Sequence, residues 1–252
     1  MIHRDVIVKA LTTTLGGLPH VRAAFLAGSQ AFGRQDRYSD IDINCVTPLD
    51  QAEGNFAAVE STLKQLSPIQ HQVEMPPSGQ WPELAQRFYR LRDTDEFLMI
   101  DFCQMTPAQL QTFLDPVRHG TPVVLFDHDN LLRPVEPDVD AHNAAMRKRL
   151  QFLRASFPVF QNLVRKAVHR GDLLEAMAMW MGQTMRPLVE VLRMKHCPAR
   201  YDYGFRYTTY DLPAAVAAEL QELMWPKGAQ DMLQKLDQAG ALFEAVAAGL
   251  FK

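Results

Sequence analysis

Helical and extended apolar patterns alternate through the first 130 residues of the chain. Apolar side chains recur every three or four positions in residues 5–15 and 56–66, and this spacing predicts two amphipathic helices. Short apolar runs bounded by polar or glycine-containing segments predict strands. The mixture predicts an α+β fold built on a small mixed sheet, with strands over residues 21–27, 41–46, 96–105 and 121–126.

Prolines and a capping threonine punctuate the same region. Five proline and glycine residues between positions 68 and 82 predict a loop after the second helix. Thr106 precedes Pro107, and a threonine followed by proline at the first helical position predicts the start of a further helix.

The second half of the chain shows helical spacing without a convincing strand pattern. Two prolines within residues 132–137 disfavour helix, so we place a boundary there and expect a catalytic domain, 1–134, followed by an all-helical C-terminal domain, 135–252. Pro187 predicts a kink inside this helical domain. Helices are predicted over residues 141–155, 172–195, 213–223 and 229–250.

The composition is that of an ordinary globular protein and narrows the class of partner. The chain has 252 residues, of which 47% are hydrophobic and 22% charged, with a net charge of -3. Broad nucleic-acid binding rests on clustered Lys and Arg, so this acidic balance favours a small acceptor over nucleic acid. Three cysteines without a CxxC pair suggest neither a disulfide framework nor a zinc site. We see no signal peptide and no membrane span, and we expect a cytoplasmic protein.

Three aspartates in predicted strands are the main candidates for chemistry. Asp40 and Asp42 are two positions apart, so their side chains leave the same face of a strand. Asp101 lies in another apolar strand, where an unpaired charge would be costly to bury. A divalent cation held by the three carboxylates would compensate these charges, and Mg²⁺ prefers such oxygen ligands together with substrate phosphates.

A glycine-serine pair precedes these aspartates at the end of the first predicted strand. Gly28 and Ser29 offer backbone N–H groups at close approach and one hydroxyl, which suit a phosphate. Gly33 and Arg34, in the polar loop before Asp40, could continue this phosphate-binding segment.

The run AFLAGSQAFGRQDRYSDIDINCV, residues 24–46, resembles the signature of the DNA polymerase β-type nucleotidyltransferase superfamily. Gly-Ser is followed by a ten-residue spacer, then Asp-hydrophobic-Asp, with a later carboxylate on a strand. The resemblance implies a nucleotidyltransferase domain that binds two Mg²⁺ ions through Asp40, Asp42 and Asp101. It also implies that Asp101 is the base for the acceptor hydroxyl, while Ser29 binds the NTP phosphates.

The helical half is similar to the C-terminal region of aminoglycoside and lincosamide adenylyltransferase-like proteins, through residues 200–207 and 211–213. This similarity implies transfer of AMP from an NTP, ATP in the first instance, to a hydroxyl of a small molecule such as an aminoglycoside-like antibiotic. The NTP is expected between the two domains, with a basic residue of the helical half on the triphosphate. Lys166 is preferred for its apolar surroundings among the candidates Arg165, Lys166, Arg170, Arg186 and Lys195.

Other interpretations stay open at this stage. The superfamily also contains enzymes that nucleotidylate a protein or an RNA end, and a non-catalytic nucleotide-binding protein could retain the same fold. Asp36 is interpreted as a solvated loop residue, and Cys45 and Cys103 as small buried residues rather than nucleophiles.

Overall fold

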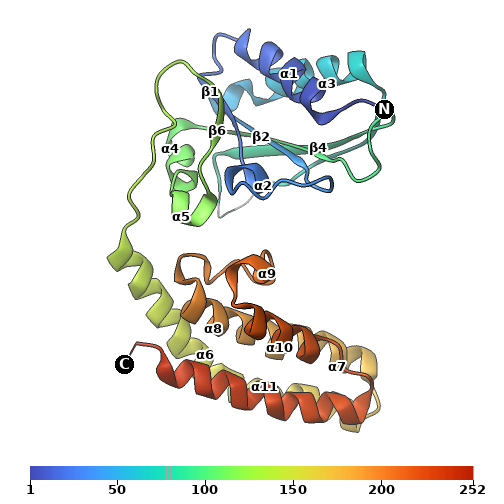
Figure 1. The fold of residues 1–252 in the computed structure, drawn as a ribbon, viewed down its shortest axis with the longest axis vertical. Helices are drawn as coiled ribbons and strands as arrows, with labels where there is room; N and C mark the ends of the chain where they lie inside the picture. The colour runs from blue at the N-terminus through green and yellow to red at the C-terminus, as the bar shows by residue number, and fades with distance from the viewer. Residues whose placement is uncertain (78, 80, 252) are drawn as a thin grey trace. The chain divides into compact units, whose positions relative to one another are not determined.

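The computed structural model describes residues 1–77, 79 and 81–251 and divides into two compact units. The first unit, Met1–Pro137, contains a six-stranded sheet with helices, and the second, Asp138–Lys252, is helical (Figure 1). These elements confirm the predicted α+β class with a helical C-terminal part. The exact domain limits stay a prediction. Among the described residues, no helix combines the length and the apolar character needed to cross a bilayer.

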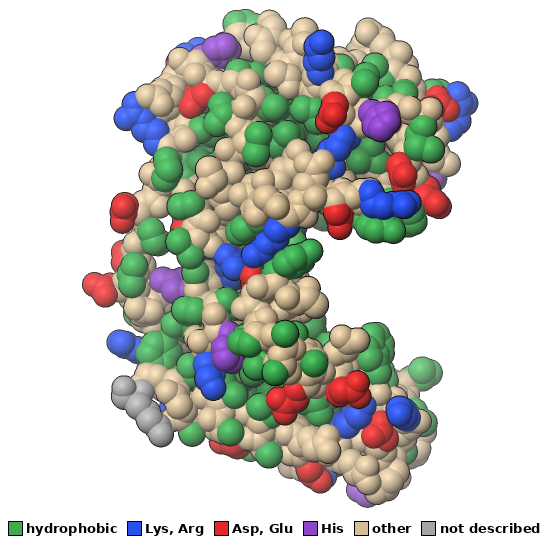
Figure 2. Space-filling model, in the orientation of Figure 1, with side chains coloured by type: hydrophobic (Ala, Val, Ile, Leu, Met, Phe, Trp, Pro, Cys, Tyr) green, Lys and Arg blue, Asp and Glu red, His purple; other side chains and the backbone are tan. Residues whose placement is uncertain are grey.

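Acidic and basic side chains are interspersed over the part of the first unit that Figure 2 shows. Apolar and uncharged groups separate them on this face. Interspersed charges of both signs are typical of the solvent-exposed surface of a folded domain.

The sheet has the strand order β3-β4-β5-β2-β1-β6. β2 and β5 are parallel, and the other neighbouring pairs are antiparallel. Because β2 and β5 run in the same direction, residues near their beginnings lie at the same edge of the sheet. The strands are β1 (Ala23–Leu26), β2 (Ile41–Val46), β3 (Ile69–Glu74), β4 (Leu84–Leu91), β5 (Ile100–Met105) and β6 (Val123–Asp127).

The two faces of the sheet have different neighbours because side chains alternate along each strand. On one face, Ile43 is buried in a core to which α1 (Arg4–Gly16) and α3 (Ala52–Leu66) contribute. On the other face, Met105 belongs to a smaller core that contains Leu110 at the end of α4 (Pro107–Leu110). The Asp42 carboxylate leaves the strand on this second face.

The predicted cap at Thr106 is confirmed. Its Oγ1 accepts a hydrogen bond from Gln109 N at 3.2 Å, which satisfies one of the N–H groups left without a partner at the start of α4. The other short helices of this unit are α2 (Gly28–Ala31), the 3₁₀ helices η1 (Leu49–Gln51) and η2 (Gln111–Phe113), and α5 (Pro116–His119).

β3 and β4 form where the sequence pattern predicts a loop or no regular element. The side chains of β3, an edge strand, are mostly exposed, so the apolar alternation that reveals a strand is missing. On β4, Arg87 occupies a position where the strand pattern would require an apolar residue, and it pairs with Glu53, Glu60 and Glu74. The prolines at 76, 77 and 82 lie between the two strands, where they interrupt neither ladder. Positions 78 and 80 of the predicted loop lie outside the described residues.

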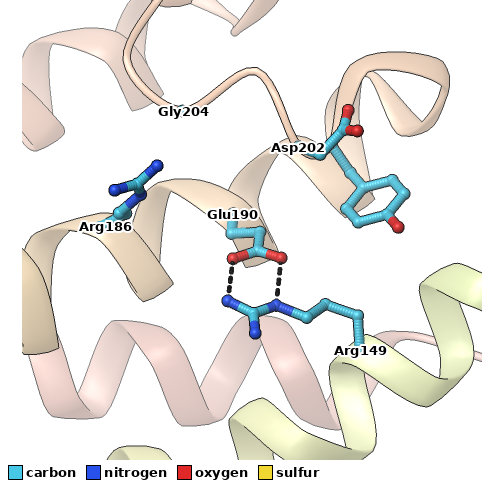
Figure 3. Close-up of a pocket in the computed structure, with 6 residues that line it drawn as sticks. Arg149, Arg186, Glu190, Asp202 and Gly204 are labelled. Carbon is cyan, nitrogen blue, oxygen red and sulfur yellow. Dashed lines mark hydrogen bonds and ion pairs between the residues drawn. The ribbon is translucent and has the colours of Figure 1, made fainter. Parts of the chain in front are cut away.

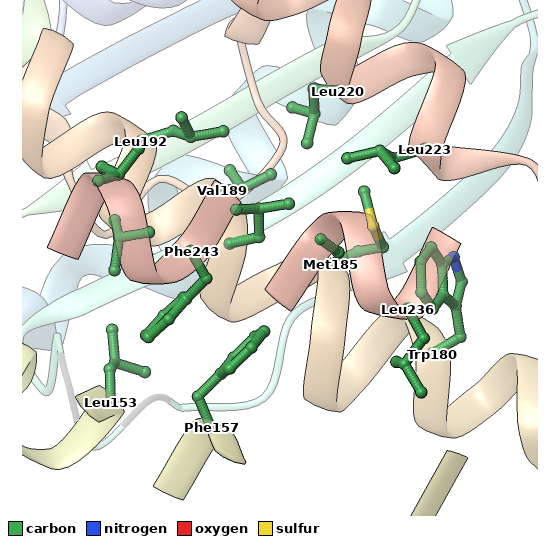
Figure 4. Close-up of a cluster of buried hydrophobic side chains, with 14 of the residues drawn as sticks. Leu153, Phe157, Trp180, Met185, Val189, Leu192, Leu220, Leu223, Leu236 and Phe243 are labelled. Atoms are coloured by element: carbon green, nitrogen blue, oxygen red, sulfur yellow. The ribbon is translucent and has the colours of Figure 1, made fainter. Parts of the chain in front are cut away.

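The helical unit has its own hydrophobic core (Figure 4). The rings of Phe157 and Phe243 are stacked with their centroids 3.9 Å apart. Trp180 is fully buried, and its Nε1 donates to the carbonyl of Met224 at 3.4 Å. The helices are α6 (Val139–His169), α7 (Leu173–Met179), α8 (Arg186–His196), the 3₁₀ helix η4 (Pro198–Arg200), α9 (Thr208–Asp211), α10 (Ala214–Met224) and α11 (Ala229–Gly249).

A π-helix, Trp180–Met185, precedes Pro187, where the sequence predicts a kink. Proline has no N–H, so the carbonyl of Gln183 loses its usual donor four residues later. Gln161 of α6 replaces that donor, because its Nε2 lies 3.0 Å from Gln183 O. Thr184 Oγ1 donates to Gln161 Oε1 at 2.7 Å and holds the amide in this orientation.

Candidate active site

Two of the candidate carboxylates are direct neighbours across the parallel pair of strands. Asp42 of β2 and Asp101 of β5 are register partners, so their side chains leave the same face of the sheet. Asp40 directly precedes β2, two positions before Asp42. All three aspartates are half-buried. The structure therefore places Asp42 beside Asp101, with Asp40 at the entry to the same strand.

Gly28 lies against the carboxylate of Asp42. The glycine follows β1 and begins α2 with a φ of +57°, a conformation that side chains disfavour. A Cβ atom at this position would lie 1.9 Å from Asp42 Oδ2. The sequence argument explains this glycine by the approach of a phosphate. The structure adds a reason that requires no ligand, because the carboxylate occupies the space that a side chain would need.

The hydroxyl of Ser29 is buried and has no hydrogen-bond partner within the described part of the chain. An unsatisfied buried hydroxyl costs about 1–3 kcal/mol, so natural structures seldom leave one without a role. Ser29 directly follows the glycine that contacts Asp42. The group is therefore suited to a hydrogen bond with a ligand held beside the carboxylates.

Arg34 is tied to the same segment. Its backbone N donates to the carbonyl of Ser29 at 2.8 Å, and its guanidinium carbon lies 5.0 Å from the centre of the Phe32 ring. The structure therefore connects the second half of the predicted phosphate-binding segment to the first. Contact of Arg34 with phosphate stays a prediction.

Two residues that the sequence argument did not assign to the site hold the loop before Asp40. Asp36 Oδ1 accepts hydrogen bonds from Tyr38 N at 2.9 Å and from Ser39 Oγ at 3.0 Å. Arg4 of α1 donates to the carbonyl oxygens of Ser39 and Asp40 at 3.2 and 2.9 Å. The Asp-x-x-Ser spacing could have indicated the first contact. No local signal exists for the second, because Arg4 lies 36 positions before Asp40.

Arg4 also contributes positive charge near the aspartates. Burial lowers the pKa of its guanidinium, while the negative charges of Asp5, Asp42 and Asp40 act in the opposite direction. The aspartates at the start of β2 are therefore close enough to this cation to interact with it. Arg4 therefore binds the Asp40 backbone and adds positive charge near Asp40 and Asp42.

A glutamine donates to the third carboxylate. Gln86 of β4 lies with its Nε2 2.7 Å from Asp101 Oδ1. Sequence reasoning missed this residue because the pattern around β4 did not predict a strand, so nothing indicated that its side chain reaches β5.

The cysteines beside the aspartates are buried, as predicted. Burial raises the pKa of the Cys45 thiol. The pKa of Cys103 is raised by burial in the first place and by the charge of Asp101 in the second. Thiols with a raised pKa form little thiolate, so these side chains serve as packing residues.

Within the described residues, no group of three or more His, Cys, Asp or Glu side chains is arranged so that it could by itself hold a metal ion. Mg²⁺ is usually bound through one or two carboxylates completed by water and substrate phosphates rather than by an all-protein cage. The pair formed by Asp42 and Asp101 fits that mode of binding.

The basic residues predicted to reach the triphosphate belong to the helical unit. Lys166 is exposed on α6, and its contact with a nucleotide stays a prediction. Arg165 pairs with Asp237. Arg186 lines a cavity of about 320 Å³ (Figure 3). Arg149 and Glu190, which also line it, form a bidentate ion pair in which Nε and Nη2 donate to Oε1 and Oε2 at 2.6 and 2.8 Å.

Comparison with known proteins gives one family match. A sequence model described as streptomycin adenylyltransferase matches residues 4–252. No match was found among curated proteins. Solved structures similar to this chain include an aminoglycoside 6-adenyltransferase from Bacillus subtilis, with 13% identity, a TM-score of 0.37 and coverage of 98% of this chain and 90% of that one. They also include the spectinomycin adenyltransferase AAD(9) from Enterococcus faecialis with ATP and spectinomycin, with 11% identity, a TM-score of 0.38 and coverage of 99% and 100%.

Proposed function

Because the chain belongs to the streptomycin adenylyltransferase family, we propose that it transfers AMP from ATP to a hydroxyl group of a small aminoglycoside-like molecule and releases diphosphate. The family match extends over both units, residues 4–252. The net charge of -3 supports a small acceptor rather than nucleic acid.

The observation that carries this proposal is the register pairing of Asp42 with Asp101, together with the buried hydroxyl of Ser29, which follows the glycine that lies against Asp42. Transfer of a phosphoryl group requires the attacking hydroxyl, the α-phosphate and the departing diphosphate to be held in line while negative charge is neutralised. Paired carboxylates hold cations, and a nearby hydroxyl donor binds phosphate oxygen. The two kinds of group that this chemistry needs therefore occur together on one edge of the sheet.

Asp42 and Asp101, with Asp40 at the entry to the same strand, are the residues that would hold magnesium together with the phosphates of ATP. Two Mg²⁺ ions, when bound, neutralise the charge that develops on the α-phosphate and on the departing diphosphate. The carboxylate oxygens are the hard ligands that this ion prefers.

The remaining roles are proposals that the resemblance to nucleotidyltransferases suggests and that the positions of the side chains permit. Asp101 would accept the proton of the acceptor hydroxyl as that oxygen attacks the α-phosphorus. Ser29 Oγ would donate to the β- or γ-phosphate, which satisfies a buried hydroxyl that has no partner in the described structure. Arg34, linked through its backbone to Ser29, would add positive charge at the departing diphosphate.

The function is tested by incubating the protein with Mg²⁺, ATP labelled at the α-phosphate, and separate acceptors: streptomycin, spectinomycin, a lincosamide and a simple alcohol. We expect label to appear in one class of antibiotic, with one diphosphate released for each AMP transferred. Label in protein or RNA of a cell extract, with none in the small molecules, would instead support nucleotidylation of a macromolecule. Tight ATP binding without diphosphate release for any acceptor would contradict an enzymatic role.

A further inference from the structure

Gln86 and Asp101 lie on the same face of the sheet. Phe88 of β4 is the register partner of Asp101, and Gln86 is the partner of Cys103. Since side chains alternate, Gln86 and Phe88 project from the face on which Asp101 projects, which is also the face of Asp42. The Gln86 amide thus approaches Asp101 diagonally across the ladder, and its Nε2 reaches Oδ1 at 2.7 Å.

This hydrogen bond restricts how the Asp101 carboxylate turns. A carboxylate can rotate about its Cβ–Cγ bond, and χ2 of aspartate is broadly distributed when nothing holds it. A donor on Oδ1 selects one rotation and so determines where Oδ2 points. Outer hydrogen bonds of this kind are a common way of orienting carboxylates that bind metals.

Gln86 is also an uncharged donor to Asp101. An arginine or lysine at position 86 would neutralise Asp101 and compete with a cation for it. The adjacent arginine, Arg87, projects from the opposite face, where it pairs with Glu53, Glu60 and Glu74. The strand therefore gives Asp101 a neutral donor while it directs its positive charge elsewhere.

We propose that Gln86 is a positioning residue that holds Asp101 in the orientation required for metal binding and for accepting the proton of the acceptor. This inference rests on the proposed function, because it assigns Asp101 to the metal-ATP site. Gln86 is not proposed to touch the metal or the substrate. It acts through the one carboxylate to which it donates.

The test replaces Gln86 with methionine, which keeps the length of the side chain and removes the N–H donor. Binding of Mn²⁺ is measured by electron paramagnetic resonance in the presence of an ATP analogue with a methylene bridge between its α- and β-phosphorus atoms. We expect Q86M to raise the Mn²⁺ dissociation constant by about 10–100-fold, the usual cost of losing an outer-shell partner. The thermal midpoint should stay close to that of the unchanged protein.

Gln72 provides a matched control on the neighbouring strand. Its Nε2 donates to Glu60 Oε1 at 2.9 Å, so it is also a glutamine that binds a carboxylate, but Glu60 belongs to α3. Q72M should bind Mn²⁺ like the unchanged protein. Equal losses in Q72M and Q86M would show a general effect on the sheet and would overturn the inference.

The double variant Q86M/D101N separates positioning from a purely structural role. If Gln86 acts through Asp101, Q86M should have no further effect on Mn²⁺ binding once D101N is present. An additive effect, or wild-type binding by Q86M while D101N binds poorly, would overturn the inference and leave the proposed function intact. Unchanged Mn²⁺ binding by D101N alone would contradict the metal site itself, and the role of Gln86 with it.

Discussion

Gly28 shows that the site depends on contacts between single residues of neighbouring strands. The sequence identified Gly28 and Asp42 as members of one motif, separated by a fixed spacing. It could not show that they touch, since the contact joins the end of β1 to the neighbouring strand β2. The same limit applies to Arg4 and Asp40, which are distant in sequence and hydrogen-bonded in the structure.

Replacing Gly28 with alanine should abolish transfer activity and lower the stability of the protein. Gly28 has a φ of +57° and an added Cβ would lie 1.9 Å from Asp42 Oδ2, so the variant must move the carboxylate. We expect a loss of stability of about 1–2 kcal/mol from the backbone conformation, and loss of ATP-dependent transfer from the displaced aspartate. Thermal unfolding and the labelled-ATP assay measure the two effects.

Gly171 supplies the control for that variant. It has a φ of +76° and nothing within 4 Å of an added Cβ. G171A should lose a similar amount of stability and keep its transfer activity. Comparable activity in G28A and G171A would show that the contact with Asp42 does not matter.

Elements with regular apolar patterns were predicted, and those without were not. Some predicted limits were wrong, because β5 begins at Ile100 rather than Glu96 and α6 continues to His169 rather than ending at Ala155. The alternation in β2 gave its observed limits, Ile41–Val46, because one face of this central strand is wholly buried. β3 and β4 were not predicted, because most side chains of β3 are exposed and β4 carries the charged Arg87 within its pattern. Because β4 was not predicted, the sequence could not show that Gln86 reaches the candidate site.

In the helical unit, a buried ion pair organises the segment after α8. The side chains of Arg193 and Asp211 are both 0% exposed, and Arg193 Nη1 lies 3.0 Å from Asp211 Oδ2. Arg193 also donates to the carbonyls of Gly204 at 2.7 Å and Arg200 at 3.1 Å. Helical spacing could not predict this cluster, because the groups around Arg193 come from α8, the following loop and α9.

We expect D211N to destabilise the protein by roughly 3–5 kcal/mol near neutral pH, because it leaves buried arginine charge uncompensated. Burial acts to raise the pKa of Asp211, but hydrogen bonds from Arg200 and Arg193 outweigh it, so the pKa lies below the ordinary 3.8. The stabilisation is therefore present above pH 3.8 and lost as the pH falls through the lower, folded-state pKa. Urea unfolding at pH 7 and pH 3 should show the effect of D211N shrinking at the acidic pH.

Asp237 gives the comparison for D211N, since it pairs with Arg165 while 68% of its side chain is exposed. D237N should change stability by less than about 1 kcal/mol at either pH. Equal effects of the two variants would contradict a special role for the buried pair.

At the scale of the whole molecule, the family match spans both units, whereas the candidate carboxylates all belong to Met1–Pro137. The donor side of the reaction could therefore be inferred from a short motif within one unit. The acceptor could not, because we found no motif in the sequence whose spacing identifies it.

The most direct test of the account measures diphosphate release from ATP and Mg²⁺, with the acceptor that takes up most label, for the unchanged protein, D42N and D50N. Asp50 is an exposed aspartate just beyond β2 and serves as the control. Loss of a partner of a metal ligand lowers metal affinity or activity by up to about 100-fold. Loss of the ligand itself should cost more, so D42N should release diphosphate more than about 100-fold more slowly. Its thermal midpoint should be unchanged or higher, because carboxylate repulsion is relieved. Diphosphate release by D42N at the rate of D50N would contradict the assignment of Asp42 and the account that rests on it.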